Sequence, residues 1–192
     1  MKKEKLDAFT DAVVAIIITL MVLEIKLPQV TADNLWEVLR HIAIYALSFV
    51  VIGITWLNYN TFFKYVDKIT TRIIWLNLSF LFMLSLVPLP TQALGEAFFV
   101  KESHMFYGII LALVATSYSL MYKSASHYLT HLSKAEIKII NRKNWMAVGC
   151  YVLSVPLSLV SIYLSTAIFI IMPAIYFIPS RKLVEEHGQE NA

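Results

Sequence analysis

Residues 5–28 read KLDAFTDAVVAIIITLMVLEIKLP, and this stretch decides the class of fold. Its apolar part is long enough to cross a bilayer as a helix, which takes about 20 residues. Asp11 lies in its first turns, and a carboxylate on a membrane span marks a functional site or a buried polar network by default. Further along, Ile16, Leu20 and Leu23 follow at spacings of four and three, so they share one face of the helix.

The rest of the chain has the same membrane character. Of its 192 residues, 58% are apolar and 15% are charged, whereas soluble domains have about 45–50% and about 25%. The apolar residues fall into long runs separated by short charged stretches, which indicates a polytopic membrane protein. The first run is too long and too polar at its start for a signal peptide, so we expect a mature helix. Cys150 is the single cysteine, which excludes an internal disulfide.

The hydropathy pattern predicts one all-α domain over residues 1–192 with six membrane spans. They are expected at about residues 6–25, 35–63, 73–94, 105–122, 145–163 and 165–178. Pro88 and Pro90 interrupt the third span near its end, and Pro156 and Pro173 should kink the last two. Residues 123–143 form the only sizeable loop, where apolar residues alternate with lysines and predict a short interfacial helix near anionic headgroups.

The basic residues predict the orientation in the membrane. With six spans, all but three of the 16 lysines and arginines fall on the side of the two termini. The three on the other side are Lys26, Arg40 and Lys101. Because cytoplasmic loops carry the excess of lysine and arginine, both termini are expected in the cytoplasm.

Patterns that would indicate catalysis or metal binding are missing from the sequence. His127 and His131 stand four residues apart, but without the HExxH pattern they are best interpreted as a surface pair. There is no glycine-rich phosphate loop, no GxSxG elbow and no TVGYG potassium filter. We therefore expect neither an enzyme nor a carbonyl selectivity filter, and neither a cofactor nor a nucleic-acid partner.

A set of polar and aromatic residues gathers at the predicted cytoplasmic ends of the first three spans. Asp11 lies about 140° around the helix from Ile16, so it should not share the face of the apolar stripe. A buried carboxylate requires hydrogen-bond donors, which Trp56, Asn77 or Lys5 would supply. We expect a structural network, with a direct role in transport as the alternative. Its members are Lys5, Phe9, Thr10, Asp11, Trp56 and Asn77.

The first span resembles the signature of the transmembrane protein 175 family, the endosomal and lysosomal potassium channels, in its prokaryotic single-repeat form. That signature is R-x-x-x-F-S-D followed by an apolar run ending near LxLEI. This chain reads K-L-D-A-F-T-D, with Lys5 and Thr10 in place of Arg and Ser. Lysine lacks the bidentate fork of arginine, so the network should differ in detail. In the second span IGITWLNYNTFF is similar to the family pattern, with Asn58 and Asn60 where relatives often carry histidine. The resemblance is specific over roughly the first 95 residues.

This resemblance implies a homotetramer of six-helix subunits around a central pore lined by the first helix. Carried onto this chain, the apolar constriction of that pore is formed by Ile16, Leu20 and Leu23, with the polar Thr19 close to the same face. Glu24 would lie at the outer mouth and attract cations. The alternative for Glu24 is a salt bridge to Lys26 or Arg40, or an interfacial charge.

The function that this implies is a leak-type, potassium-permeable cation channel of the bacterial plasma membrane. Its partners would be copies of itself, membrane lipids and the permeant potassium ion. The alternative is a secondary or proton-coupled transporter of the inner membrane, which requires ionisable residues near the middle of the membrane. The features of the sequence that would support a transporter are Asp11 and the proline kinks. A membrane-embedded enzyme would need a nucleophile–base pair or metal ligands, and neither is evident.

Overall fold

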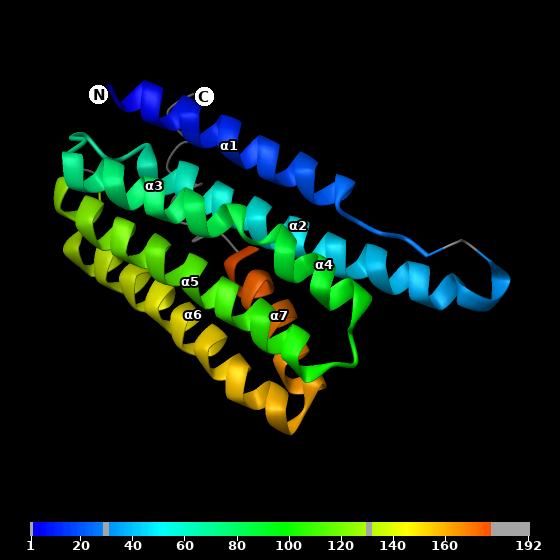
Figure 1. Cartoon of the computed structure of the whole chain (residues 1–192). Helices are drawn as coiled ribbons and strands as arrows, with labels where there is room; N and C mark the ends of the chain where they lie inside the picture. The colour runs from blue at the N-terminus through cyan, green and yellow to red at the C-terminus, as the bar shows by residue number, and fades with distance from the viewer. Residues whose placement is uncertain (1, 29–30, 130–131, 178–192) are drawn as a thin grey trace, which may run out of the picture.

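The computed structural model describes residues 2–28, 31–129 and 132–177, and they form a bundle of helices (Figure 1). Four stretches are long and apolar enough to cross a membrane, and the last helix is a shorter apolar one. The chain is therefore a multi-pass membrane protein. The helices are α1 (Lys3–Leu23), α2 (Leu35–Phe63), α3 (Thr71–Ser85), α4 (Pro88–Glu96), α5 (Lys101–Ala125), α6 (Lys134–Val160) and α7 (Ile162–Phe177), with short 3-10 turns η1 (Ala32–Asn34) and η2 (Ser126–Tyr128).

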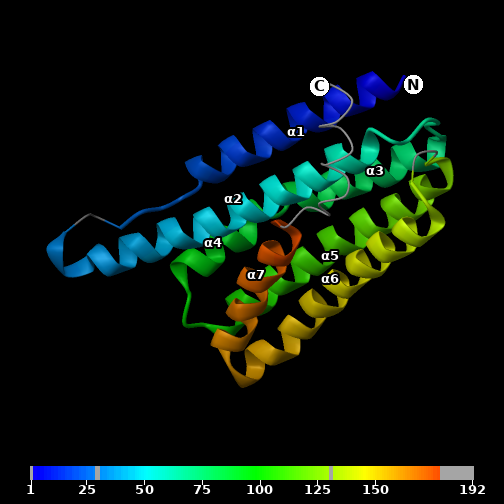
Figure 2. The same ribbon diagram turned by 180° about the vertical axis from the view of Figure 1, so that it is seen from behind.

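Two apolar cores hold the bundle together. The first joins α1, α2, α3 and α5 around fully buried rings that include Tyr59, Phe63 and Phe80. The second joins α2, α4, α5, α6 and α7 around Tyr107 and Phe169, whose ring centroids lie 4.8 Å apart. Figure 2 shows α7 between α2 and the α5–α6 pair. In both views α1 lies along one edge of the bundle, so only one side of it is packed.

The predicted interruption of the third span is confirmed as a break between two helices. α3 ends at Ser85, and α4 starts at Pro88. Proline is suited to the first turn of a helix because its missing N–H would have no intrahelical partner there. Pro156 and Pro173 lie inside α6 and α7.

The predicted loop at 123–143 with its separate interfacial helix is wrong. α5 continues to Ala125, and α6 already begins at Lys134, so the charged segment forms the first turns of α6. Ser133 caps this start, since its Oγ accepts a hydrogen bond from the backbone N–H of Glu136 at 3.2 Å. The Glu136 carboxylate accepts from the backbone N–H of Ser133 at 2.9 Å in return. At the other end, only Ser161 separates α6 from α7. His131 and Ile178 lie outside the described residues.

Three basic segments meet at one end of the bundle. The Lys3 ammonium donates to the backbone carbonyl of Lys64 at 2.8 Å. The N–H of Asp67 donates to the carbonyl of Tyr128 at 3.2 Å. Figure 1 accordingly shows the N-terminus, the α2–α3 connection and the α5–α6 connection side by side. The lysines and arginines of these segments therefore lie at a common end of the molecule.

The close packing of α5 against α6 gives a first testable prediction. A Cβ added at Gly108 would lie 2.5 Å from Ser154 Oγ and 3.3 Å from Val155 Cγ2, both on α6. We expect Gly108→Ala to lower the free energy of unfolding by about 1–3 kcal/mol, because either the Ser154 hydroxyl has to leave its hydrogen bond to the Tyr151 carbonyl or α6 has to shift. Gly149→Ala is the matched control, since nothing lies within 4 Å of its added Cβ. Thermal unfolding of both variants in detergent measures the difference, and equal melting temperatures would contradict it.

Candidate functional site

The exposed face of α1 carries all three residues of the predicted constriction. Ile16, Leu20 and Leu23 are 56%, 49% and 78% exposed. Ile17, one position along, is only 4% exposed and belongs to the first core. The buried face of α1 consists of Leu6, Thr10, Val14, Ile17 and Met21. Three large apolar side chains thus project away from the subunit although the opposite face is closely packed.

Phe9 lies on the same exposed face. It is 48% exposed, and it stands seven residues before Ile16, which places it about 20° from Ile16 around the helix. Phe9, predicted as a member of the polar network, therefore lies on the exposed apolar face, two turns closer to the N-terminus than Ile16.

Thr19 is the polar residue of this face. Its side chain is exposed. Its hydroxyl lies 3.0 Å from the carbonyl oxygen of Ala15 and 2.9 Å from that of Ile16, and it donates its hydrogen within the helix. A threonine hydroxyl bonded in this way is satisfied even in an apolar environment.

An open cavity of about 290 Å³ runs beside the stripe, between α1 and the break between α3 and α4. Val13, Ile16, Ile17 and Leu20 line it from α1. Ser85, Pro88 and Leu89 line it from the opposite side, and Glu24 lies at its edge. The break in the third span is therefore adjacent to the candidate pore face.

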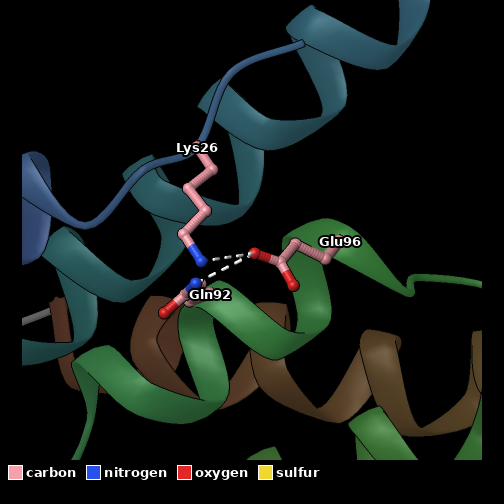
Figure 3. A network of polar contacts seen from close by, with 3 residues as sticks. All are labelled: Lys26, Gln92 and Glu96. Atoms are coloured by element: carbon pink, nitrogen blue, oxygen red, sulfur yellow. Dashed lines mark hydrogen bonds and ion pairs between the residues drawn. The ribbon is translucent and has the colours of Figure 1, made fainter.

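Glu24 is exposed at the end of α1. Neither cation considered as its partner contacts it among the described residues. Lys26 lies 3.7 Å from the Glu96 carboxylate, and Arg40 lies 3.6 Å from Glu37. Within α4, Gln92 donates to Glu96 at 2.9 Å. The ion pair of Lys26 with Glu96 links the chain that follows α1 to α4 (Figure 3).

The polar network has Thr10 at its centre. Thr10 is fully buried, and its Oγ accepts a hydrogen bond from Asn77 Nδ2 of α3 at 3.0 Å. It also lies 3.3 Å from the hydroxyl of Tyr59 on α2. The three hydroxyl and amide groups thereby join α1, α2 and α3 in the interior of the first core.

Asp11 forms a second link between α1 and α2. The indole N–H of Trp56 donates to Asp11 Oδ1 at 2.8 Å. Asn77 contacts Thr10 rather than Asp11. Within the described chain, Lys5 makes no side-chain hydrogen bond or ion pair, and it is exposed like Asp11. Of the three donors considered from the sequence, Trp56 is the one that lies within hydrogen-bond distance of Asp11.

Two members of this network, Asp7 and Tyr59, were not predicted from the sequence. The Tyr59 hydroxyl lies 3.4 Å from Asp7 Oδ1, and its ring is completely buried. Spacing would have indicated both: Asp7 precedes Thr10 by three residues, and Tyr59 follows Trp56 by three, so each shares a helix face with a known member. The described residues contain no group of three or more His, Cys, Asp or Glu side chains arranged to hold a metal ion.

Comparisons with known proteins show which family the chain resembles. The family model described as "Endosomal/lysosomal potassium channel TMEM175" matches residues 5–88, which include α1 from Lys5 onward, α2, α3 and the polar network. A solved structure titled a lysosomal potassium-selective channel TMEM175 homolog from Chamaesiphon minutus has a TM-score of 0.80 and 25% sequence identity. That likeness covers 92% of this chain and 96% of the other.

Curated relatives have similar names. A potassium channel of Chryseobacterium sp. (strain P1-3) is 33% identical over 193 residues, covering the whole of both chains. The "Endosomal/lysosomal proton channel TMEM175" of Gallus gallus is 32% identical over 117 residues, which are 54% of this chain and 23% of that protein. With a third of its residues identical to a relative of the same length and its first three helices matched by the family model, the chain belongs to the TMEM175 potassium channel family.

Proposed function

We propose that the chain forms a leak-type, potassium-permeable channel, a homotetramer whose four copies of α1 surround a central pore. The observation that carries this proposal is the exposed apolar face of Ile16, Leu20 and Leu23, opposite a closely packed face of the same helix. An exposed apolar face on a membrane helix meets either lipid or a pore shared with other subunits, and the crosslinking pattern described below separates the two. Membership in a family whose relatives are named potassium channels supports the same function.

The chemistry of this face defines how ions would pass. Rings of isoleucine and leucine offer an ion no oxygen ligands, and a narrow apolar constriction gates by losing its water. Potassium is larger than sodium and holds its water less tightly, so partial dehydration favours potassium. The Thr19 oxygen lies about one turn from both Ile16 and Leu23 along the helix and would replace part of the lost hydration.

The proposed orientation places both termini and the common basic end of the bundle in the cytoplasm, with six spans in the bacterial plasma membrane. Glu24 then lies at the outer mouth of the pore. Its carboxylate, which is free of Lys26 and Arg40, would raise the local concentration of cations.

Ion flux from proteoliposomes tests the proposed function. We expect purified protein to release potassium down its gradient, faster than sodium, without any imposed proton gradient. Proton flux is measured in parallel because one relative is named a proton channel. Potassium movement that requires a proton gradient would reject the channel and favour the proton-coupled transporter.

Fourfold assembly predicts a specific crosslinking pattern. In a Cys150→Ser background, Ile16→Cys and Leu20→Cys should form disulfides between subunits, since the same residues would face one another across the axis. Ile17→Cys is the control because its side chain is buried within its own subunit. Non-reducing electrophoresis after mild oxidation detects the bands. Equal crosslinking at positions 16 and 17, or a monomeric protein in both detergent and lipid, would contradict the assembly.

A further inference from the structure

The first turns of α6 carry a row of cations that the proposed channel does not use. Lys134, Lys138 and Arg142 follow at intervals of four residues, so they lie within about 80° of one another around the helix. All three are exposed. Within the part of the chain that the structure describes, none of them makes a side-chain hydrogen bond or ion pair. We call these three residues the basic row.

The neighbouring Lys143 behaves differently. Its ammonium donates to the carbonyl of Ile175 at 3.2 Å and lies 4.3 Å from the centre of the Tyr176 ring. Lys143 thus holds α6 against α7 and is part of the bundle. The basic row lies on another side of α6 and is free to bind a ligand.

The basic row continues directly into an exposed apolar face of α6. Trp145 follows on the same side of α6 and is 39% exposed. After it come exposed apolar side chains on the same side, namely Val152, Leu153, Leu159 and Val160. Tryptophan favours the boundary between the hydrocarbon and the headgroups, where it anchors a helix. Trp145 therefore marks the depth at which the hydrocarbon layer ends.

Helix geometry gives the depth of each cation relative to Trp145. At 1.5 Å per residue, Arg142 lies about 4.5 Å, Lys138 about 10.5 Å and Lys134 about 16.5 Å beyond Trp145. The headgroup region on each side of a bilayer is about 5–8 Å thick. Arg142 therefore lies among the headgroups. Lys138 and Lys134 lie in the water beyond them, at distances over which anionic lipids still attract a cation, since the Debye length is about 8 Å. All three charges thus act on the same leaflet.

From this juxtaposition we infer that the basic row and Trp145 form a binding site for the headgroup of an anionic phospholipid, at the start of α6. The fit depends on α6 being continuous from Lys134, because a flexible loop would not hold three cations in line above a lipid-facing stripe. Each cation near an anionic surface strengthens binding about fivefold. The site does not involve ion permeation, so it can be confirmed or rejected independently of the proposed channel.

Tryptophan quenching by brominated lipids tests this site. The full chain is reconstituted in mixtures of brominated phosphatidylglycerol with phosphatidylcholine, and in the converse mixtures. The signal of Trp145 is the difference between the wild type and Trp145→Phe. We expect phosphatidylglycerol to be preferred at Trp145 by more than about tenfold. Equal quenching by the two lipids in the wild type would overturn the inference.

Charge-matched variants distinguish binding at the basic row from a general attraction of lipids to the positive charge at this end of the bundle. Lys134→Gln, Lys138→Gln and Arg142→Gln together should reduce the preference to within about twofold. Lys64→Gln, Lys68→Gln and Arg72→Gln together remove as many exposed charges from the α2–α3 connection and should leave it unchanged. Equal losses in both triple variants would overturn the site. If the first triple variant does not fold, Lys138→Gln alone decides, with an expected loss of about fivefold.

An excess of inorganic phosphate distinguishes a lipid from a free anion. We expect it to leave the quenching by brominated phosphatidylglycerol unchanged when ionic strength is held constant. Displacement of the lipid by phosphate, but not by chloride, would show that the site binds a soluble anion and would overturn its assignment to a lipid.

Discussion

Ile16→Asn should raise the potassium conductance and lower the preference for potassium over sodium. In the proposed tetramer the change places four amides at the narrowest ring, and each hydrogen bond to an ion's water is worth about 0.5–1.5 kcal/mol. A barrier lowered by only about 1.4 kcal/mol gives a tenfold faster passage, so we expect conductance to rise by roughly that factor. If both ions keep more of their water, the difference between the hydration energies of potassium and sodium contributes less to selectivity. Single-channel currents and reversal potentials in mixed potassium and sodium solutions measure both effects.

Ile17→Asn is the matched control for this prediction. The two isoleucines are adjacent on α1 at nearly the same depth, but Ile17 is buried in the first core. Its replacement should leave permeation nearly unchanged in the protein that still assembles and should destabilise the fold, because a buried amide loses its hydrogen bonds to water. Leu20→Asn should act like Ile16→Asn with a smaller effect. Equal effects at positions 16 and 17 on conductance would remove the case for a pore on this face.

Asp11→Asn should weaken folding or assembly more than it changes ion preference. The carboxylate accepts the indole N–H of Trp56 at 2.8 Å, and a hydrogen bond to a charged group contributes about 1.5–3 kcal/mol. We expect a lower melting temperature and a smaller fraction of the proposed tetramer, with the potassium-to-sodium permeability ratio of the protein that still assembles unchanged. Thermal unfolding, size-exclusion chromatography and reversal potentials give the three readouts.

Combining Asp11→Asn with Trp56→Phe shows whether this pair is the cause. If the two side chains act through their mutual hydrogen bond, the double variant loses less stability than the sum of the single ones. Trp75→Phe is the control, because Trp75 is 68% exposed and has no such partner among the described residues. A variant at Asp11 that assembles normally but changes the permeability ratio would contradict the structural role.

The sequence predicted helix bounds most reliably where a long, largely apolar segment contains no proline. α2 has the predicted bounds, because such a segment has few alternatives to a helix. Pro88 and Pro90 likewise located the break in the third span. The start of α6 was missed because hydropathy registers the charges of residues 134–143 but not their helical conformation. The pattern of Ser133 and Glu136, three residues apart, was the local signal that a helix begins there.

For the candidate site, the sequence predicted the exposed face of α1 but not the buried polar contacts. Periodicity alone separates Ile16 from Ile17, since the two point about 100° apart on any helix. It does not show which polar residue of the first helix becomes the buried one. That depends on how α2 and α3 pack against α1, which brings Tyr59 and Asn77 to Thr10 and leaves Asp11 at the surface of the subunit. Contacts between segments about 50–70 residues apart have no signature within either segment.

The hydroxyl of Thr19 has a consequence for the sign of the charge that the proposed pore admits. Its hydrogen points back to the carbonyls of Ala15 and Ile16, so only the electronegative oxygen is left toward the axis. An oxygen without a free hydrogen stabilises a cation and offers nothing to chloride. Four such dipoles, all oriented alike, would repel anions from a wall that carries no net charge. Rejection of anions would then be built into the backbone hydrogen bonding of α1, in addition to the attraction of Glu24 for cations.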